Sequence, residues 1–368
     1  MPQNNRQVVL FFIPSFEGGG AEKVMITVAN EMADRGQSVV ICVGNGEGPY
    51  RKLIAANITL VDCESPRLRS SFKPLVRCLK TYQPDVIYST IVEANIAVSW
   101  ARKLARVDSR LVLREAISSQ FLLGLGPLYY RCLKLVAKRV YQGADAIVSV
   151  SNGVETDLIE FLDTTRDERF WVIYNPANPD IADLVNMPAE WGKKRPHNPR
   201  YIVTMGRLSP QKGFDILLKA LQLVQKTTDI DLVILGEGEL RTELESLASQ
   251  LSLRNVHFLG FRENPYPILQ QASVFVLSSN FEGMPNALID AMALNIPVVS
   301  TNCPTGPDEI LENGKWGTLV DVGDYQALAQ GILKALTISN VSHYPPESSS
   351  RFSLNHVVDD YMAAGNLL

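Results

Sequence analysis

The sequence predicts an α/β protein with two tandem, doubly wound, Rossmann-like domains. Short apolar runs rich in β-branched residues alternate with longer helical patterns along most of the chain, which is typical of parallel sheets built from βαβ units. A chain of 368 residues with 46% hydrophobic content is too long for one ordinary core. A polar, proline-bearing stretch also interrupts the alternation near the middle.

The first half follows this alternation in order. A strand at 8–13 leads through a glycine cluster into a helix at 21–35. Further strands are predicted at 39–43, 86–89, 110–113 and 146–150. We therefore assign residues 1–186 to an N-terminal domain.

The second half repeats the pattern after a linker at 187–199, with the sequence MPAEWGKKRPHNP. Strands are predicted at 201–205, 231–235, 256–259, 274–277 and 297–300, and helices from 214 onward, at 239–251 and at 285–294. Residues 200–350 form the second domain, and 351–368 a C-terminal helix. Ligands of open parallel sheets bind beyond the carboxyl ends of the strands, so we expect the functional site between the two halves.

Composition argues against several classes of protein. Five scattered cysteines do not indicate a disulfide framework. No apolar run approaches the roughly 18 residues that a membrane span needs, and the polar start of the sequence is unlike a signal peptide. We expect a cytoplasmic protein.

The net charge of −4 hides a basic region. Residues 65–139 hold 14 lysines and arginines against four acidic residues, and apolar and aromatic residues lie among the cations at 121–131. This combination suits peripheral contact with an anionic membrane, here the inner face of the plasma membrane, although a packed helix with solvated charges is the ordinary alternative. Nucleic acid is not expected, because no recognition module is present and the rest of the chain is acidic.

A glycine-rich turn follows the first strand. Gly18, Gly19 and Gly20 let the backbone approach a ligand, and the helix that follows offers free N–H groups to an anion or a hydroxyl-rich group. Tight packing explains such a turn equally well. The spacing differs from the GxGxxG of dinucleotide-binding enzymes, which argues against a dehydrogenase.

Charged residues follow two strands of the second half. Arg207 and Lys212 come after the strand at 201–205, where two cations would hold a diphosphate. Glu282 comes after the strand at 274–277, and Asp290 lies eight residues later on the next helix. Carboxylates accept hydrogen bonds from sugar hydroxyls, and a helix N-terminus favours phosphate. Solvated surface charges, or an acid that compensates the helix dipole, are the alternatives.

Six short motifs follow one another along the chain. They are GGGAE at 18–22, GRL at 206–208 with Lys212, GEG at 236–238, LGF at 259–261, FEGMP at 281–285 and PVVST at 297–301. As an ordered set, they resemble the retaining GT-B glycosyltransferases of glycosyltransferase family 4, over nearly the whole chain. Bacterial enzymes that extend surface polysaccharides or lipid-linked oligosaccharides are the most similar group.

The resemblance implies transfer of a hexose or N-acetylhexosamine from a nucleotide sugar, expected to be UDP-linked, to a glycan or lipid-linked acceptor, with no metal or cofactor. Arg207 and Lys212 would neutralise the diphosphate and Glu282 would bind the donor sugar, so these three are the expected catalytic residues. The N-terminal domain would bind the acceptor, and the C-terminal helix would cross back to it. The remaining donor-binding residues would be Gly206, Gly236, Leu259, Gly260, Phe261, Gly283, Met284, Pro285, Asn286 and Asp290.

Two positions depart from the family pattern. Asp290 stands where a second glutamate usually holds the ribose, and the N-terminal half lacks the histidine that many members place near the donor sugar. Arg114 and Glu115 occupy the comparable strand end and, with the three glycines, are the candidate acceptor or cleft residues. An ion pair between Arg114 and Glu115 is the structural alternative.

No residue supplies an obvious enzymic nucleophile, so we expect displacement on one face of the sugar through an oxocarbenium-like state. Two other functions remain open. A GT-B-shaped UDP-sugar epimerase would share the fold and the nucleotide site, and a non-catalytic partner would bind a nucleotide sugar or glycan for a larger assembly.

Overall fold

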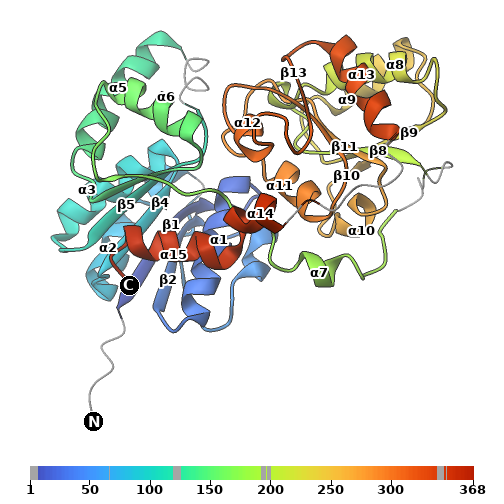
Figure 1. The fold of residues 1–368 in the computed structure, drawn as a ribbon. Helices are drawn as coiled ribbons and strands as arrows, with labels where there is room; N and C mark the ends of the chain where they lie inside the picture. Colours follow the sequence, from blue (N-terminus) through green and yellow to red (C-terminus); the bar gives the residue numbers. More distant parts are fainter. Residues whose placement is uncertain are drawn as a thin grey trace. The chain divides into compact units, whose positions relative to one another are not determined.

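The computed structural model describes residues 7–65, 67–118, 126–191, 196, 200–337, 344 and 346–368. They form two compact units, each with its own parallel sheet and covering helices (Figure 1). The first contains residues up to Asn175 together with 354–368, and the second contains 176–353. The predicted fold class, two doubly wound α/β units, is confirmed.

The boundary between the units lies at Pro176, earlier than the end of the first domain predicted at 186. Residues 187–191, 196 and 200 follow within the second unit, and the rest of the proposed linker lies outside the described residues. The short helix α7 (Ile181–Leu184) also belongs to this unit.

The first unit contains a seven-stranded parallel sheet in the order β3-β2-β1-β4-β5-β6-β7. The direction of strand addition reverses between β1 and β4. The strands are β1 (Val8–Ser15), β2 (Ser38–Asn45), β3 (Thr59–Asp62), β4 (Val86–Thr90), β5 (Arg110–Glu115), β6 (Ala146–Ser149) and β7 (Phe170–Val172).

Helices cover both faces of this sheet, which is why its strands read as continuous apolar runs. Leu10 and Phe12 of β1 face one core, while Val9 and Phe11 face the other, because successive side chains alternate. The helices are α1 (Gly20–Asp34), α2 (Phe72–Tyr82), α3 (Val92–Ala105), α5 (Pro127–Tyr141), α6 (Asn152–Leu162) and α15 (Leu354–Ala364).

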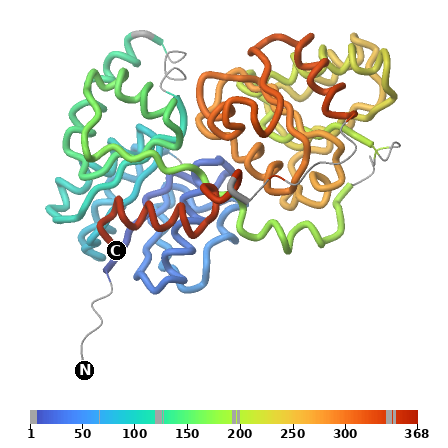
Figure 2. The backbone as a smooth tube through the Cα atoms, in the orientation of Figure 1, coloured from blue at the N-terminus to red at the C-terminus, as the bar shows by residue number. Residues whose placement is uncertain are grey.

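Helix α15 is last in the sequence but packs beside α1, as the red and blue segments of Figure 2 show. Arg35 of α1 pairs with Asp359. The hydroxyl of Tyr88 on β4 donates to the carbonyl of Tyr361 at 2.7 Å, and the two rings meet edge to face. The helix completes one apolar face of the first unit. It begins at Leu354, after a 3-10 turn at Ser350–Phe352.

The second unit contains a six-stranded parallel sheet in the order β10-β9-β8-β11-β12-β13. The strands are β8 (Tyr201–Met205), β9 (Asp231–Leu235), β10 (Val256–Gly260), β11 (Val274–Leu277), β12 (Val298–Thr301) and β13 (Thr318–Val320). The longer helices are α8 (Phe214–Val224), α9 (Arg241–Gln250), α11 (Asn286–Ala293) and α13 (Tyr325–Leu336), and the short ones include α10 (Tyr266–Leu269), α12 (Pro307–Ile310) and α14 (Pro346–Ser349).

None of the described helices combines the length and apolar character that a membrane crossing requires.

Candidate active site

The candidate site of the second unit lies where its strand order reverses. β8 and β11 are neighbours in the sheet, and the chain leaves them in opposite directions, to β9 and to β12. In open α/β sheets the loops diverge at this switch point and leave room for a ligand. Lys212 follows β8 and Glu282 follows β11, so the fold brings together two residues that are 70 positions apart.

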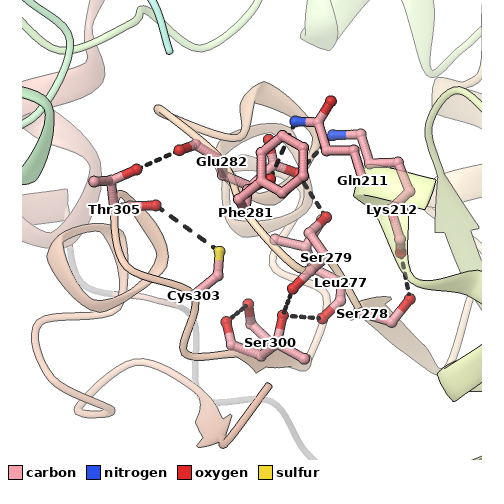
Figure 3. Close-up of polar contacts among 11 residues, drawn as sticks. Gln211, Lys212, Leu277, Ser278, Ser279, Phe281, Glu282, Ser300, Cys303 and Thr305 are labelled. Carbon is pink, nitrogen blue, oxygen red and sulfur yellow. Dashed lines mark hydrogen bonds and ion pairs between the residues drawn. The ribbon is translucent and has the colours of Figure 1, made fainter. Parts of the chain in front are cut away.

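Lys212 and Glu282 form a largely buried ion pair (Figure 3). Lys212 Nζ lies 2.5 Å from Glu282 Oε1, and Ser279 Oγ donates to the same oxygen at 2.6 Å. Glu282 is only 5% exposed. Such a pair is costly to desolvate unless further hydrogen bonds satisfy it, and Ser279 supplies one of them.

The two loops are also tied together through their backbones. The Gln211 side chain donates to the Phe281 carbonyl at 3.1 Å, and Ser278 Oγ donates to the Lys212 carbonyl at 2.9 Å. Gly213 has φ +56°, and a Cβ there would stand 2.2 Å from the Ser278 carbonyl. Only glycine permits this approach, so the turn after Lys212 is fixed against the loop that carries Glu282.

The loop after β12 closes the other side of Glu282. The Thr305 hydroxyl donates to the Glu282 carbonyl, as Figure 3 shows. Gly306, with φ +96°, brings the backbone so close to Gly283 that a Cβ would lie 2.8 Å from its carbonyl oxygen. Met284 and Pro285 are buried behind it, and Asn286 begins α11. The predicted donor-binding segment is therefore a rigid turn that leads into a helix N-terminus.

Arg207 differs from Lys212 in being exposed. No hydrogen bond or ion pair of its guanidinium is found within the described part of the chain. Gly206 lies against the aliphatic stem of Lys212, and Gly236 lies close to the Gly206 carbonyl. The tight backbone packing of these glycines sets Arg207 and Lys212 at one strand end.

The residues predicted to contact the nucleobase differ in their exposure to solvent. Leu259 and Gly260 are buried at the end of β10, while the Phe261 side chain is 53% exposed. Gly260 has φ +81°, which turns the chain at this edge. An exposed aromatic ring beside a glycine turn offers a stacking surface for a planar base.

Asp290 is held in a buried hydrogen-bonded group. Its Oδ2 accepts from the Tyr266 hydroxyl at 3.0 Å and its Oδ1 from the Asn178 backbone N–H at 3.2 Å. The Asn178 side chain donates to the Tyr266 hydroxyl at 2.7 Å. Burial, with the Asp290 charge, raises the pKa of Tyr266 well above its usual range, so the hydroxyl keeps its proton and donates it.

Cys303 lies beside this site. Burial and, to a smaller extent, the nearby Glu282 charge raise the pKa of its thiol to about 12, against the opposing effect of Lys212. At neutral pH it therefore stays protonated and is a poor nucleophile.

The glycine turn of the first unit is occupied by a carboxylate. Gly20 begins α1, and the Glu22 side chain folds back so far that a Cβ on Gly19 would meet it at 1.9 Å. An acid in this place compensates the helix dipole. The turn, in which Gly18 has φ +121°, therefore already holds one carboxylate at the start of the helix.

Arg114 and Glu115 are both buried in the first unit, and their side chains leave β5 on opposite faces. Arg114 donates to Thr90 at 2.9 Å and to Asn175 at 2.7 Å. Glu115 accepts from Asn95 of α3 at 2.9 Å and from the Tyr141 hydroxyl of α5. Strand alternation therefore gives each residue its own partners, and the structural alternative of an ion pair between them is not observed.

Burial also changes the chemistry of Glu115. It raises the pKa of the carboxyl to about 8, although the Asn95 hydrogen bond and the Arg114 charge work in the opposite direction. Glu115 is thus a neutral acid over most of the physiological range, and this property could not be read from its place in the sequence.

Residues that were not predicted to belong to the site also lie within it. They are Asn178, Ser279, Tyr266 and Thr305, all hydrogen-bonded to Glu282 or Asp290 or to their backbones. Ser279 and Thr305 each come shortly after a predicted strand, and this position could have marked them as candidate site residues. Asn178 and Tyr266 carried no such signal, because Asn178 lies in an irregular segment and Tyr266 begins a helix of only four residues. Within the described ranges, no three His, Cys, Asp or Glu side chains gather into a group that could hold a metal.

Comparisons with known proteins identify the class of enzyme. A model described as Glycosyltransferase Family 4 matches residues 18–181, and one described as Glycosyl transferases group 1 matches 189–351. HepE of Anabaena, solved with UDP and glucose, superposes with a TM-score of 0.79 at 22% identity, covering 99% of this chain and 100% of that one. The chain is thus a glycosyltransferase with the GT-B fold.

Curated relatives narrow the class to a family. The lipopolysaccharide core biosynthesis glycosyltransferase LpsE of Rhizobium meliloti is 35% identical over 319 residues, or 85% of this chain and 84% of LpsE. A Campylobacter jejuni N-acetylgalactosaminyltransferase, whose name specifies a diphospho-undecaprenol-linked acceptor, is 27% identical over 334 residues, or 87% of this chain and 88% of that protein. The chain belongs to glycosyltransferase family 4.

Proposed function

We propose that this glycosyltransferase transfers a hexose or N-acetylhexosamine from a UDP-sugar, with retention of anomeric configuration, to a glycan or lipid-linked oligosaccharide in bacterial surface polysaccharide synthesis. The main support is the Lys212–Glu282 pair at the switch point of the second sheet. A cation for the diphosphate and a carboxylate for the sugar are adjacent there, as the transfer requires. The names of LpsE and of the Campylobacter enzyme support the class of acceptor.

Donor binding would exchange partners within this pair. The diphosphate would draw Lys212 Nζ away from Glu282, and exposed Arg207 would supply the second cation. Glu282 would then accept hydrogen bonds from the sugar hydroxyls, with Ser279 still holding Oε1. Because the two cations would stabilise the departing nucleoside diphosphate, we expect no requirement for a metal. Added chelator should then leave the initial rate unchanged.

Retention would follow from displacement on one face of the sugar. The leaving phosphate oxygen would take the proton of the acceptor hydroxyl, and Arg207 and Lys212 would stabilise the charge left on the diphosphate. Cys303, the one cysteine of the second unit, is protonated and offers no thiolate for a covalent intermediate. NMR of the product should show the anomeric configuration of the donor. An inverted linkage would refute this mechanism.

The experiment that tests the function is a donor and acceptor screen. The full chain is incubated with UDP-, GDP- and ADP-sugars and with lipid-linked saccharide acceptors, and products are followed by mass spectrometry. We expect a glycosylated acceptor and free UDP. Turnover of donor alone into an isomeric nucleotide sugar would indicate an epimerase, and binding without any turnover would indicate a non-catalytic partner.

We further propose that the first unit contacts an anionic membrane through α3 and α5, two helices that pack together. Exposed Trp100 and Leu104 of α3 lie on a basic helix that also carries Lys103. Leu128 and Leu135 of α5 alternate on its exposed face with Arg131 and Arg139. Apolar side chains flanked by cations suit such a surface.

This membrane proposal is tested by liposome flotation. The protein should float with phosphatidylglycerol vesicles at low salt and not with phosphatidylcholine vesicles, and Leu128→Ser/Leu135→Ser should reduce the bound fraction. No flotation of the wild type would refute the proposal. The segment 119–125, which belongs to the predicted basic region, lies outside the described residues.

A further inference from the structure

Asp290, which stands at the position expected to bind ribose, is held by neighbours that lie outside the FEGMP motif. Asp290 is shorter than glutamate by one methylene, so it has less reach and needs a defined orientation to meet a pair of hydroxyls. Both of its oxygens accept hydrogen bonds within the second unit, one from the Tyr266 hydroxyl and one from the Asn178 backbone. These contacts fix the plane of the carboxylate.

The neighbours are themselves fixed. The Asn178 side chain donates to the Tyr266 hydroxyl at 2.7 Å, which closes a ring of three groups. Asn264 Oδ1 accepts from the Tyr266 backbone N–H at 3.2 Å, and Asn264 Nδ2 donates to the Leu184 carbonyl at 2.9 Å. The Tyr266 side chain is 2% exposed, so its hydroxyl has little freedom to turn to another acceptor.

Asn178 also connects this ring to the chain segment that enters the second unit. It lies two residues after Pro176, where the unit begins. The N–H of the intervening Ala177 donates to the Phe352 carbonyl at 2.8 Å, and Phe352 lies just before the chain leaves the unit again. Asp290 is therefore oriented by one of the two segments that join the units.

We propose that Tyr266 and Asn178 are positioning residues that orient Asp290 toward the ribose hydroxyls of the nucleotide. A carboxylate held in its binding orientation loses little freedom when the ligand arrives, so the contact contributes more to affinity. The inference rests on the proposed function, because it takes UDP as the nucleotide. In this proposal the hydrogen-bonded ring of Asp290, Tyr266 and Asn178 determines the affinity for the ribose and has no part in the chemical step.

The test compares UDP with 2′,3′-dideoxy-UDP, which lacks both ribose hydroxyls, by calorimetric titration of the full chain. Tyr266→Phe removes the donor to Asp290 and keeps the ring, and it should weaken UDP binding about fivefold to tenfold, as for loss of a charge-assisted hydrogen bond. Binding of the dideoxy analogue should change by less than about twofold. Asn178→Ala keeps the backbone donor and should have a smaller effect of the same kind.

Tyr201→Phe is the matched control. Tyr201 also has a buried hydroxyl in the second unit, which donates to the Ile268 carbonyl. The Tyr201→Phe variant should lose about as much stability as Tyr266→Phe. Its affinity for both nucleotides should equal that of the wild type. In an Asp290→Asn background, Tyr266→Phe should have no further effect on UDP binding if it acts through Asp290.

Several outcomes would overturn the inference. Equal weakening of both nucleotides by Tyr266→Phe, or no weakening, would show that Tyr266 does not act on the ribose. A wild type that binds both nucleotides equally would remove the ribose role of Asp290 while leaving a UDP-sugar donor intact. If the wild type bound neither, the proposed donor itself would be wrong, and the inference would fail with it.

Discussion

Lys212 Nζ and Glu282 Oε1 lie 2.5 Å apart at the switch point of the second sheet, with Ser279 donating to the same oxygen. The pair links the part of the site expected to hold phosphate with the part expected to hold sugar. Its two residues reach each other only because β8 and β11 are neighbours.

Replacing Glu282 by glutamine should abolish most of the activity. The amide keeps the size of the side chain but cannot match a carboxylate as an acceptor of sugar hydroxyls. We expect kcat to fall on the order of 100-fold, as for other single electrostatic contacts at reacting centres. The measurement is steady-state kinetics at saturating donor. Glu243→Gln, on an exposed position of α9, is the control and should leave the rate unchanged. Unchanged product formation in Glu282→Gln would show that Glu282 has no catalytic role.

Replacing Arg207 by glutamine should weaken binding of the donor without lowering the stability of the fold. The guanidinium is exposed, so its removal leaves no buried partner unpaired. We expect UDP affinity to fall about tenfold, the equivalent of one charge-assisted contact, and the melting temperature to stay within about 1 °C. Lys226→Gln, an exposed cation after α8, serves as the charge-matched control. Equal loss of affinity in both variants would indicate a general charge effect.

Glu115 should make the stability of the first unit depend on pH. Its folded pKa of about 8 lies above the value of an exposed glutamate, so the folded chain holds a proton that the unfolded chain releases. Its contribution is fully present below the unfolded pKa and is lost as the pH rises from about 4.5 to about 8, by at most about 1.4 kcal/mol per pH unit.

Glu115→Gln, which is neutral at every pH, should remove that dependence. Thermal melts between pH 5 and 9 should show the variant gaining stability relative to the wild type as the pH rises. Glu160→Gln, at an exposed position of α6, should keep the wild-type profile. Parallel profiles for wild type and Glu115→Gln would mean that the carboxyl ionises normally.

Thiol reactivity should separate Cys132 from the other four cysteines. Cys132 is exposed on α5, while Cys42, Cys63, Cys78 and Cys303 are buried. One thiol per chain should react rapidly with iodoacetamide at neutral pH, and mass spectrometry should place the label on Cys132. Unfolded protein should react at all five. Rapid labelling of Cys303 in the folded protein would contradict its raised pKa and its burial beside Glu282.

Much of the architecture could be predicted from local patterns. The strands at 201–205, 231–235 and 274–277 coincide with β8, β9 and β11 because residues buried on both faces of a sheet form unbroken apolar runs. The strands β3, β7 and β13 were not predicted. They have four, three and three residues and lie at the edges of their sheets, too few residues for a periodic signal.

The sequence by itself determined the fold class, the family and the candidates Arg207, Lys212, Glu282 and Asp290, because strand periodicity and strand-end motifs are local. Only the tertiary structure decided that Lys212 and Glu282 pair, and that Arg114 and Glu115 point to opposite faces with separate partners. It also decided that Glu115 is a neutral acid and that Tyr266 and Asn178 hold Asp290. These properties depend on burial and on hydrogen bonds between segments distant in the chain, which sequence spacing does not encode.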